Sequence, residues 1–175
     1  MNRSTTPEVA ARPVQQPARR ALVQAAAVAA AAALLPAAAA ASAGAEAAGA
    51  SAPAEVARAF ARAFNARDLD ALLALYPAGS VFVPAPGQAL GSREAVRQAL
   101  QGFLAIGLPI EMTVRHVYEA GDTALLVVDW AIRGTGADGR AVDMAGTGTD
   151  VVARGAGGRW HYRIDNPFGG SKPAP

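Results

Sequence analysis

The hydrophobic period changes once along the chain, near Pro109, and this change limits the possible folds more than any other feature. Before Pro109, apolar residues recur at the 3.6-residue period of amphipathic helices. After it, apolar and polar residues alternate as they do in half-buried strands. Helices followed by a run of strands predict the α+β class, with helices packed on one face of an antiparallel sheet.

Three helices and one short strand are expected before the change. The first helix spans residues 54–66, where the larger apolar side chains fall on one face. Asp68 and Ser92 are the expected N-caps of the second and third helices, because their side chains accept bonds from free N–H groups. Between these two helices, residues 80–84 predict a short strand.

Four longer strands are expected after the change. The first three are expected over 110–119, 123–133 and 141–154, and the last begins at residue 160 and ends before Pro167. Gly146 and Gly148 are expected to mark a bend or bulge in the third of them. Strict alternation places His116 on the apolar face of the first of these strands.

The first 43 residues have the order of a secretory signal. A polar stretch ends in Arg19-Arg20, residues 21–41 are almost wholly apolar, and small residues follow up to Ala43. We therefore expect a signal peptide over 1–43, on the Sec or the twin-arginine route, and a periplasmic or secreted protein. The alternative is an uncleaved membrane anchor, since about twenty apolar residues are long enough to span a bilayer.

The rest of the chain is expected to hold one domain. Residues 44–53 are rich in Ala, Gly and Ser and predict a flexible tether. The domain then occupies 54–169, and 170–175 form a tail.

Charge and cysteine content exclude several classes of function. Residues 1–43 hold four Arg and one Glu, which leaves 12 basic against 13 acidic residues in the remainder. This balance does not predict a nucleic-acid partner. With no Cys and only two His, no metal or other cofactor is expected.

Four segments resemble a known family. They are FNARDLDALLALY (64–76), VFVPAPG (81–87), GSREAVRQAL (91–100) and GGRWHYRIDNPFG (157–169). Together they resemble the nuclear transport factor 2-like superfamily, in its SnoaL-like and other bacterial branches. The resemblance implies a cone-shaped domain with three helices on a strongly curved antiparallel sheet. It also implies a homodimer that houses either an acid/base enzyme or a binding pocket.

His116, Asp129 and Asp150 are the candidate catalytic residues. A neutral imidazole facing an apolar cavity is suited to act as a general base, with Asp129 or Asp150 holding its other nitrogen. The alternatives are a packed histidine and, for Asp129, an arginine-paired carboxylate at an interface. The direction of Asp150 is left open because of the preceding glycines.

The candidate ligand-binding residues are mostly aromatic. Each of them also fits a plain core role, and Asn166 fits a turn. They are Phe60, Phe64, Tyr76, Phe82, Met112, Tyr118, Trp130, Trp160, Tyr162 and Asn166.

Three functions remain open at this point, and whether the protein is an enzyme is undecided. The first is an exported, homodimeric domain that binds a small hydrophobic molecule in an apolar pocket. The second is an acid/base lyase, isomerase or cyclase acting on a small hydrophobic carbonyl compound. The third is a protein-interaction module, suggested by apolar residues on both faces of the strand over 124–132. A membrane is involved only through the signal segment, if that segment stays uncleaved.

Overall fold

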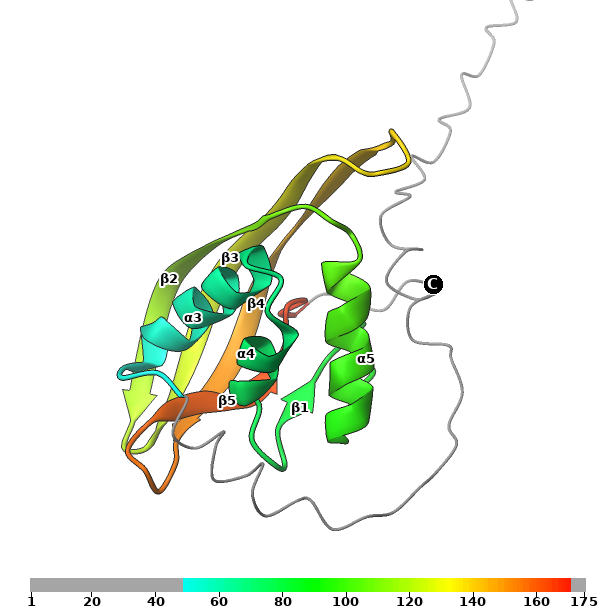
Figure 1. Cartoon of the computed structure of the whole chain (residues 1–175). Coiled ribbons are helices and arrows are strands. Elements are labelled where there is room, and N and C mark those ends of the chain that lie inside the picture. The colour runs from blue at the N-terminus through cyan, green and yellow to red at the C-terminus, as the bar shows by residue number, and fades with distance from the viewer. Residues whose placement is uncertain (1–48, 171–175) are drawn as a thin grey trace, which may run out of the picture.

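A computed structural model describes residues 49–170 (Figure 1). The expected signal peptide, the first half of the expected tether (44–48) and residues 171–175 lie outside the described residues. Within residues 49–170, no helix is long and apolar enough to cross a membrane.

The expected order of helices and strands is confirmed. The elements are α3 (Pro53–Asn65), α4 (Leu69–Ala74), β1 (Val81–Phe82), α5 (Arg93–Leu104), β2 (Ile110–Ala120), β3 (Thr123–Thr135), β4 (Ala141–Arg154) and β5 (Trp160–Asp165). They form one five-stranded sheet in the order β1-β5-β4-β3-β2. The β1–β5 pair is parallel and the other three pairs are antiparallel.

Both expected N-caps are present. The Asp68 carboxylate accepts the Ala71 N–H at 2.9 Å, at the start of α4. The Ser92 hydroxyl accepts the Ala95 N–H at 3.2 Å, at the start of α5. These bonds satisfy donors that a helix leaves free in its first turn, and they fix where each helix begins.

The core lies between the helices and the inner face of the sheet. Figure 1 shows the three helices on the same side of the curved sheet. The α3 helix buries Val56, Phe60 and Phe64 there, and β3 contributes alternate residues from Ala124 to Ile132. Asn65 joins the end of α3 to β2, because its side chain accepts the Ile110 N–H at 2.8 Å and donates to the Ile110 carbonyl at 3.0 Å.

Two β-bulges change which residues face the core. In β2, Val114 pairs with Val128 but His116 pairs with Val127, so Arg115 is the extra residue. In β5, Ile164 pairs with Val151 and Tyr162 pairs with Val152, so Arg163 is the extra residue. A bulge shifts the alternation by one, and residues beyond it turn to the opposite face.

The glycines of β4 do not form the bulge that the sequence predicted. The pairing of β3 with β4 runs without a shift past both of them. They make room for neighbours instead. A Cβ on Gly146 would lie 3.0 Å from the indole nitrogen of Trp130, and one on Gly148 would lie 3.2 Å from the Asn166 carbonyl oxygen.

The packed structure begins earlier than the predicted domain boundary. Ala50, which was expected in the tether, is buried and exchanges two backbone hydrogen bonds with Trp160, at 2.8 and 2.9 Å. A Cβ on Gly49 would lie 2.3 Å from the ring of His161, so this close approach requires glycine. His161 itself is buried.

Candidate functional site

An apolar pocket opens between the helices and the inner face of the sheet. Its volume is about 30 Å³, which is room for one or two water molecules. Most of its lining is apolar and much of it is aromatic. The lining residues are Phe60, Phe82, Leu100, Phe103, Ile110, Met112, Val128, Trp130, Gly148, Asp150, Tyr162, Asp165 and Pro167.

Two carboxyl groups line this pocket from neighbouring strands. Asp150 on β4 is 2% exposed and Asp165 at the end of β5 is 7% exposed. Asp150 faces inward because β4 keeps its alternation past the glycines. Asp165 faces inward because the bulge at Arg163 shifts the alternation of β5. Two strands thus bring two acids to one apolar pocket.

Each carboxyl group has one hydrogen-bond donor among the described residues. The Tyr76 hydroxyl donates to Oδ2 of Asp165. The backbone N–H of Asn166 donates to Oδ1 of Asp150 at 2.9 Å. Neither donor carries a positive charge, although buried carboxylates are usually paired with one.

Burial shifts the proton affinities of both acids upward. It raises the pKa of Asp165 to about 6, against a partly opposing hydrogen bond from Tyr76. Burial also raises the pKa of Asp150 well above its usual range, and the charge of Asp165 raises it further. We therefore expect the pair to hold one proton near neutral pH, because two adjacent buried carboxyls resist losing both.

The Tyr162 hydroxyl is the third polar group of the pocket. Its side chain is 1% exposed, and burial followed by the charges of Asp150 and Asp165 raises its pKa. Among the described residues, no hydrogen bond involves this hydroxyl. Every fully enclosed side-chain polar atom of the described residues has a hydrogen-bond partner. The Tyr162 hydroxyl has none among these residues, so it must border open space. Because Tyr162 lines the pocket, the pocket supplies that space. Such a group can still form a hydrogen bond with a molecule that enters the pocket.

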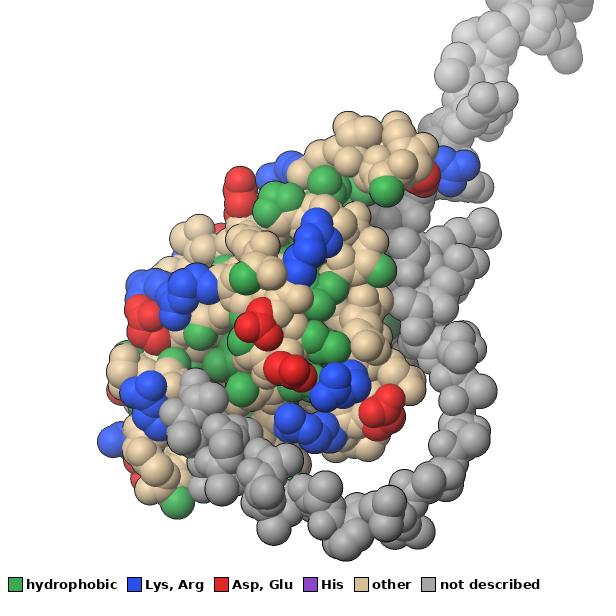
Figure 2. Space-filling view, in the orientation of Figure 1, with side chains coloured by type: hydrophobic (Ala, Val, Ile, Leu, Met, Phe, Trp, Pro, Cys, Tyr) green, Lys and Arg blue, Asp and Glu red, His purple; other side chains and the backbone are tan. Residues whose placement is uncertain are grey.

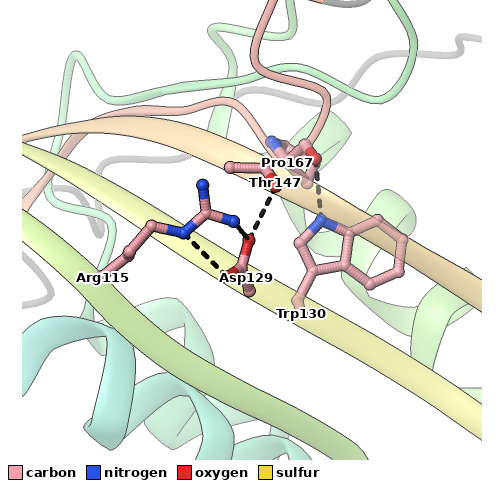
Figure 3. A network of polar contacts seen from close by, with 5 residues as sticks. All are labelled: Arg115, Asp129, Trp130, Thr147 and Pro167. Carbon is pink, nitrogen blue, oxygen red and sulfur yellow. Dashed lines mark hydrogen bonds and ion pairs between the residues drawn. The ribbon is translucent and has the colours of Figure 1, made fainter.

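The turn after β5 completes the pocket wall. The Trp130 indole N–H donates to the Pro167 carbonyl at 2.7 Å (Figure 3). The Asn166 side chain donates to the Gly169 carbonyl at 3.0 Å and to the Thr149 hydroxyl at 3.2 Å. These bonds hold Pro167 beside the two acids. Asn166 thus has the turn role considered for it, and its side chain does not line the pocket.

His116 and Tyr118 do not lie where the alternation predicted. The bulge at Arg115 turns both to the outer face of the sheet, where both are exposed. Tyr118 is 58% exposed, and its ring lies 5.9 Å from the His116 imidazole. His116 is therefore outside the pocket and cannot act there as a base.

Asp129 also lies on the outer face. It accepts hydrogen bonds from Nε of Arg115 at 3.0 Å and from the Thr147 hydroxyl at 2.7 Å (Figure 3). These bonds, the one from Arg115 first, lower its pKa. Asp129 borders a separate open hollow of about 470 Å³, so it is not a partner of Asp150. The arginine pairing considered as the alternative to catalysis is thus present, and its partner is Arg115 of the same chain.

Half of the predicted ligand-binding residues line the pocket. They are Phe60, Phe82, Met112, Trp130 and Tyr162. Tyr76 reaches the pocket only through its bond to Asp165. Phe64 and Trp160 are buried in the core, and the Arg154 guanidinium lies 5.2 Å from the Trp160 ring.

Asp165 is the site residue that sequence reasoning missed. Strict alternation gives its neighbour Asn166 the inward position, and nothing in the local sequence marks Arg163 as a bulge. The remaining signal is chemical: the IDNPFG segment places an acid at the end of a strand whose other inward residues are aromatic.

The comparison with protein families decides the assignment. The family model described as a SnoaL-like domain matches residues 57–162. The chain belongs to the SnoaL-like domain family. The superfamily resemblance drawn from the four segments is thereby confirmed.

Solved structures show that this SnoaL-like domain has the nuclear transport factor 2-like fold. A ketosteroid isomerase-like protein from Erwinia carotovora atroseptica is 21% identical, with a TM-score of 0.57 over 65% of this chain and 89% of that one. A nuclear transport factor 2-like family protein from Streptomyces avermitilis, described as a candidate dehydratase, is 24% identical, with a TM-score of 0.53 over 65% and 90%. A conserved protein from Planctomyces limnophilus is 20% identical, with a TM-score of 0.56 over 64% and 88%.

No curated protein matches this SnoaL-like domain.

Among residues 49–170, no group of three or more His, Cys, Asp or Glu side chains is arranged to hold a metal ion. The chemistry that the pocket offers is hydrogen bonding, charge and proton exchange at two acids and a phenol.

Proposed function

We propose that the domain binds a small, largely apolar molecule, with the polar end of that molecule at Asp150, Asp165 and Tyr162. One observation carries the proposal: an apolar, partly aromatic pocket has its polar side chains gathered in this one group. Ligand sites typically combine apolar walls with a few polar groups that fix orientation.

The size of the pocket limits how the ligand enters. A volume of about 30 Å³ accepts the polar head of a molecule but not its apolar body. The body must therefore displace a wall residue. Phe103 on α5 is the candidate, because it lines the pocket and is half-buried, and its ring meets that of Phe82 edge-on at 6.0 Å between centroids.

A pair of neighbouring substitutions tests this proposal. Val128 lines the pocket, whereas Val127 on the same strand faces the outer side of the sheet. Val128→Phe fills the pocket and should abolish binding, and Val127→Phe should leave binding intact. The readout is amide chemical-shift perturbation by NMR, with 1-hexanol as the probe. Equal binding by both variants would place the ligand elsewhere and refute the proposal.

Proton transfer on a bound carbonyl compound is the second candidate function. The observation that favours it is the buried pair itself, because the pKa of Asp165 is raised to about 6 and that of Asp150 is also raised. An acid with a pKa near the working pH exchanges protons efficiently. Asp165 is then the base, in place of His116, and protonated Asp150 is the acid.

Deuterium exchange tests this second function. The protein is incubated with small apolar ketones such as 2-heptanone in D₂O, and loss of the α-proton signal is followed by NMR. Catalysed exchange that disappears in Asp165→Asn but persists in the surface control Asp143→Asn supports the function. Exchange at the uncatalysed rate, in the presence of measured binding, leaves ligand binding as the only activity.

We also propose that two copies pair through the outer face of the sheet. One row across four strands on this face is apolar, because Tyr118 pairs with Leu125, Leu125 with Val151, and Val151 with Ile164. Tyr118, Leu125 and Ile164 are 58%, 38% and 40% exposed. Analytical ultracentrifugation should show a dimer that Leu125→Lys dissociates. A wild-type monomer at micromolar concentration would refute the pairing.

Export to the periplasm or outside the cell is the last part of the proposal. It is supported by the sequence pattern of residues 1–43 alone. N-terminal sequencing of the protein recovered from the periplasmic and extracellular fractions should give a start at Gly44. A chain that retains residues 21–41 in the membrane fraction would favour the anchor.

A further inference from the structure

We infer that the ligand of this pocket carries its polar end as a cation, a protonated primary amine on an apolar body. The inference rests on the proposed function and names the ligand class for the same site. It depends on the charge balance of the pocket, the number of its free acceptors and the rings that surround them.

The charge balance favours a cation. Asp150 and Asp165 are at least nine-tenths buried in one pocket. None of the described residues lining that pocket is Lys, Arg or His. The groups that donate hydrogen bonds to the two carboxyls, the Tyr76 hydroxyl and the Asn166 backbone N–H, are neutral. A buried carboxylate without a positive partner is costly, and a bound ammonium group removes that cost.

The acceptors match the donors of an ammonium group. A primary ammonium has three N–H donors and no acceptor. The pocket offers three oxygen-bearing groups: the two carboxyls and the hydroxyl of Tyr162, which feels the charges of both acids. A ligand that ends in a ketone or a carboxylate offers acceptors only. Neither group would neutralise the negative charge of the carboxyl pair.

The surrounding rings favour the same choice. Tyr162 stacks on Tyr76 at 5.1 Å between centroids and meets Phe60 edge-on at 6.1 Å. Trp130 and Phe82 complete the aromatic part of the lining. Aromatic faces attract cations, and the attraction is strongest where water is excluded. The pocket volume of about 30 Å³ also fits a head as small as an ammonium group.

Three probes of similar length test the inference. Hexylamine, 1-hexanol and 2-heptanone are titrated at pH 7 by calorimetry, and their binding site is mapped by NMR. We expect hexylamine to bind about tenfold more tightly than either neutral probe. The ammonium should also displace the proton held by the carboxyl pair. The phenols of Tyr76 and Tyr162 keep their own protons at this pH, so they do not contribute to the release. This release appears as a difference between the binding enthalpies in phosphate and in Tris.

Variants connect the preference to the acids. Asp165→Asn should reduce hexylamine affinity about tenfold and reduce 1-hexanol affinity by a much smaller factor, because only the ammonium loses a charged partner. Tyr162→Phe should weaken hexylamine more than 2-heptanone. Asp143→Asn, an exposed acid on the same strand as Asp150, should change nothing. If Asp165→Asn fails to fold, the comparison of the three probes on the wild-type protein still decides whether the pocket prefers a cation.

The possible failures are distinct. If 1-hexanol or 2-heptanone binds at the pocket as tightly as hexylamine, the cationic ligand is refuted and the proposed binding function stands. If none of the three probes perturbs a pocket residue, the proposed function fails together with the inference.

Discussion

Replacing Asp165 with Asn should flatten the pH dependence of stability of the ligand-free domain between pH 4 and pH 7. In the wild type, burial raises the pKa of Asp165 from 3.8 to about 6. The folded state thus binds this proton more tightly than the unfolded state does. Its stabilising contribution is complete below pH 3.8 and is lost as the pH rises through 6.

The size of the loss follows from the shift. A rise from 3.8 to about 6 is worth about 3 kcal/mol of unfolding free energy, at 1.36 kcal/mol for each pKa unit. Asp150 acts in the same direction because its pKa is also raised. Asp129 has the opposite effect on the pH dependence of stability, because its pKa is lowered from 3.8. Its contribution to the unfolding free energy is therefore lost only at pH values below pH 4.

Urea unfolding at pH 4, 5, 6 and 7 measures this effect, followed by the fluorescence of Trp130 and Trp160. The wild type should lose about 2 kcal/mol or more between pH 4 and pH 7, which is most of the full effect, and Asp165→Asn should lose about 2 kcal/mol less than the wild type. The variant should therefore equal or exceed the wild type in stability at pH 7. Asp143→Asn is the matched control and should follow the wild type. An unchanged slope in Asp165→Asn would refute the buried-acid interpretation.

Three further predictions concern the surroundings of the pair. Tyr76→Phe should raise the pKa of Asp165 further, because the lost hydrogen bond favours the ionised form; a carboxyl ¹³C NMR titration measures this shift. Gly146→Ala should cost about 1–3 kcal/mol in urea unfolding, because the new Cβ meets the Trp130 ring at 3.0 Å, whereas Gly91→Ala has open space and should stay within about 0.5 kcal/mol. Asp129→Asn should leave hexylamine affinity unchanged by calorimetry, since Asp129 lies on the outer face; a loss of affinity would connect the two faces.

The elements of the fold could be predicted because local signals agree with one another. The stripes of α3 and α5, the caps at Asp68 and Ser92, and the change of period near Pro109 each depend on residues close in sequence. Their agreement identified an α+β domain with three helices before any long-range contact was known.

The site could be predicted only in part, because two bulges reverse the alternation on which side-chain directions depend. Arg115 moves His116 and Tyr118 out of the pocket, and Arg163 brings Asp165 in. Both extra residues are arginines, which are equally ordinary in a regular strand with one exposed face. The two glycines of β4, where a bulge was expected, instead make room for a ring and a carbonyl. Bulges arise from pairing between strands, so they are not readable from one strand alone.

The aromatic lining was predicted more successfully than the acids. Phe60, Phe82 and Tyr162 follow their local period without a preceding bulge, so alternation places them correctly. Asp150 was placed among the candidates although its direction was open, and β4 carries it inward. The raised pKa values of the acids depend on burial and on each other, which are properties of the folded molecule.

A carboxyl ¹³C NMR titration of Asp150, Asp165 and Asp129, with and without hexylamine, tests the central claim most directly. The account predicts that Asp150 and Asp165 titrate well above 3.8 in the free protein. Both should shift downward when hexylamine binds, while Asp129 titrates below 3.8 and does not respond. Normal titration of the buried pair, with no response to hexylamine, 1-hexanol or 2-heptanone, would contradict both the buried pair and the binding site built on it.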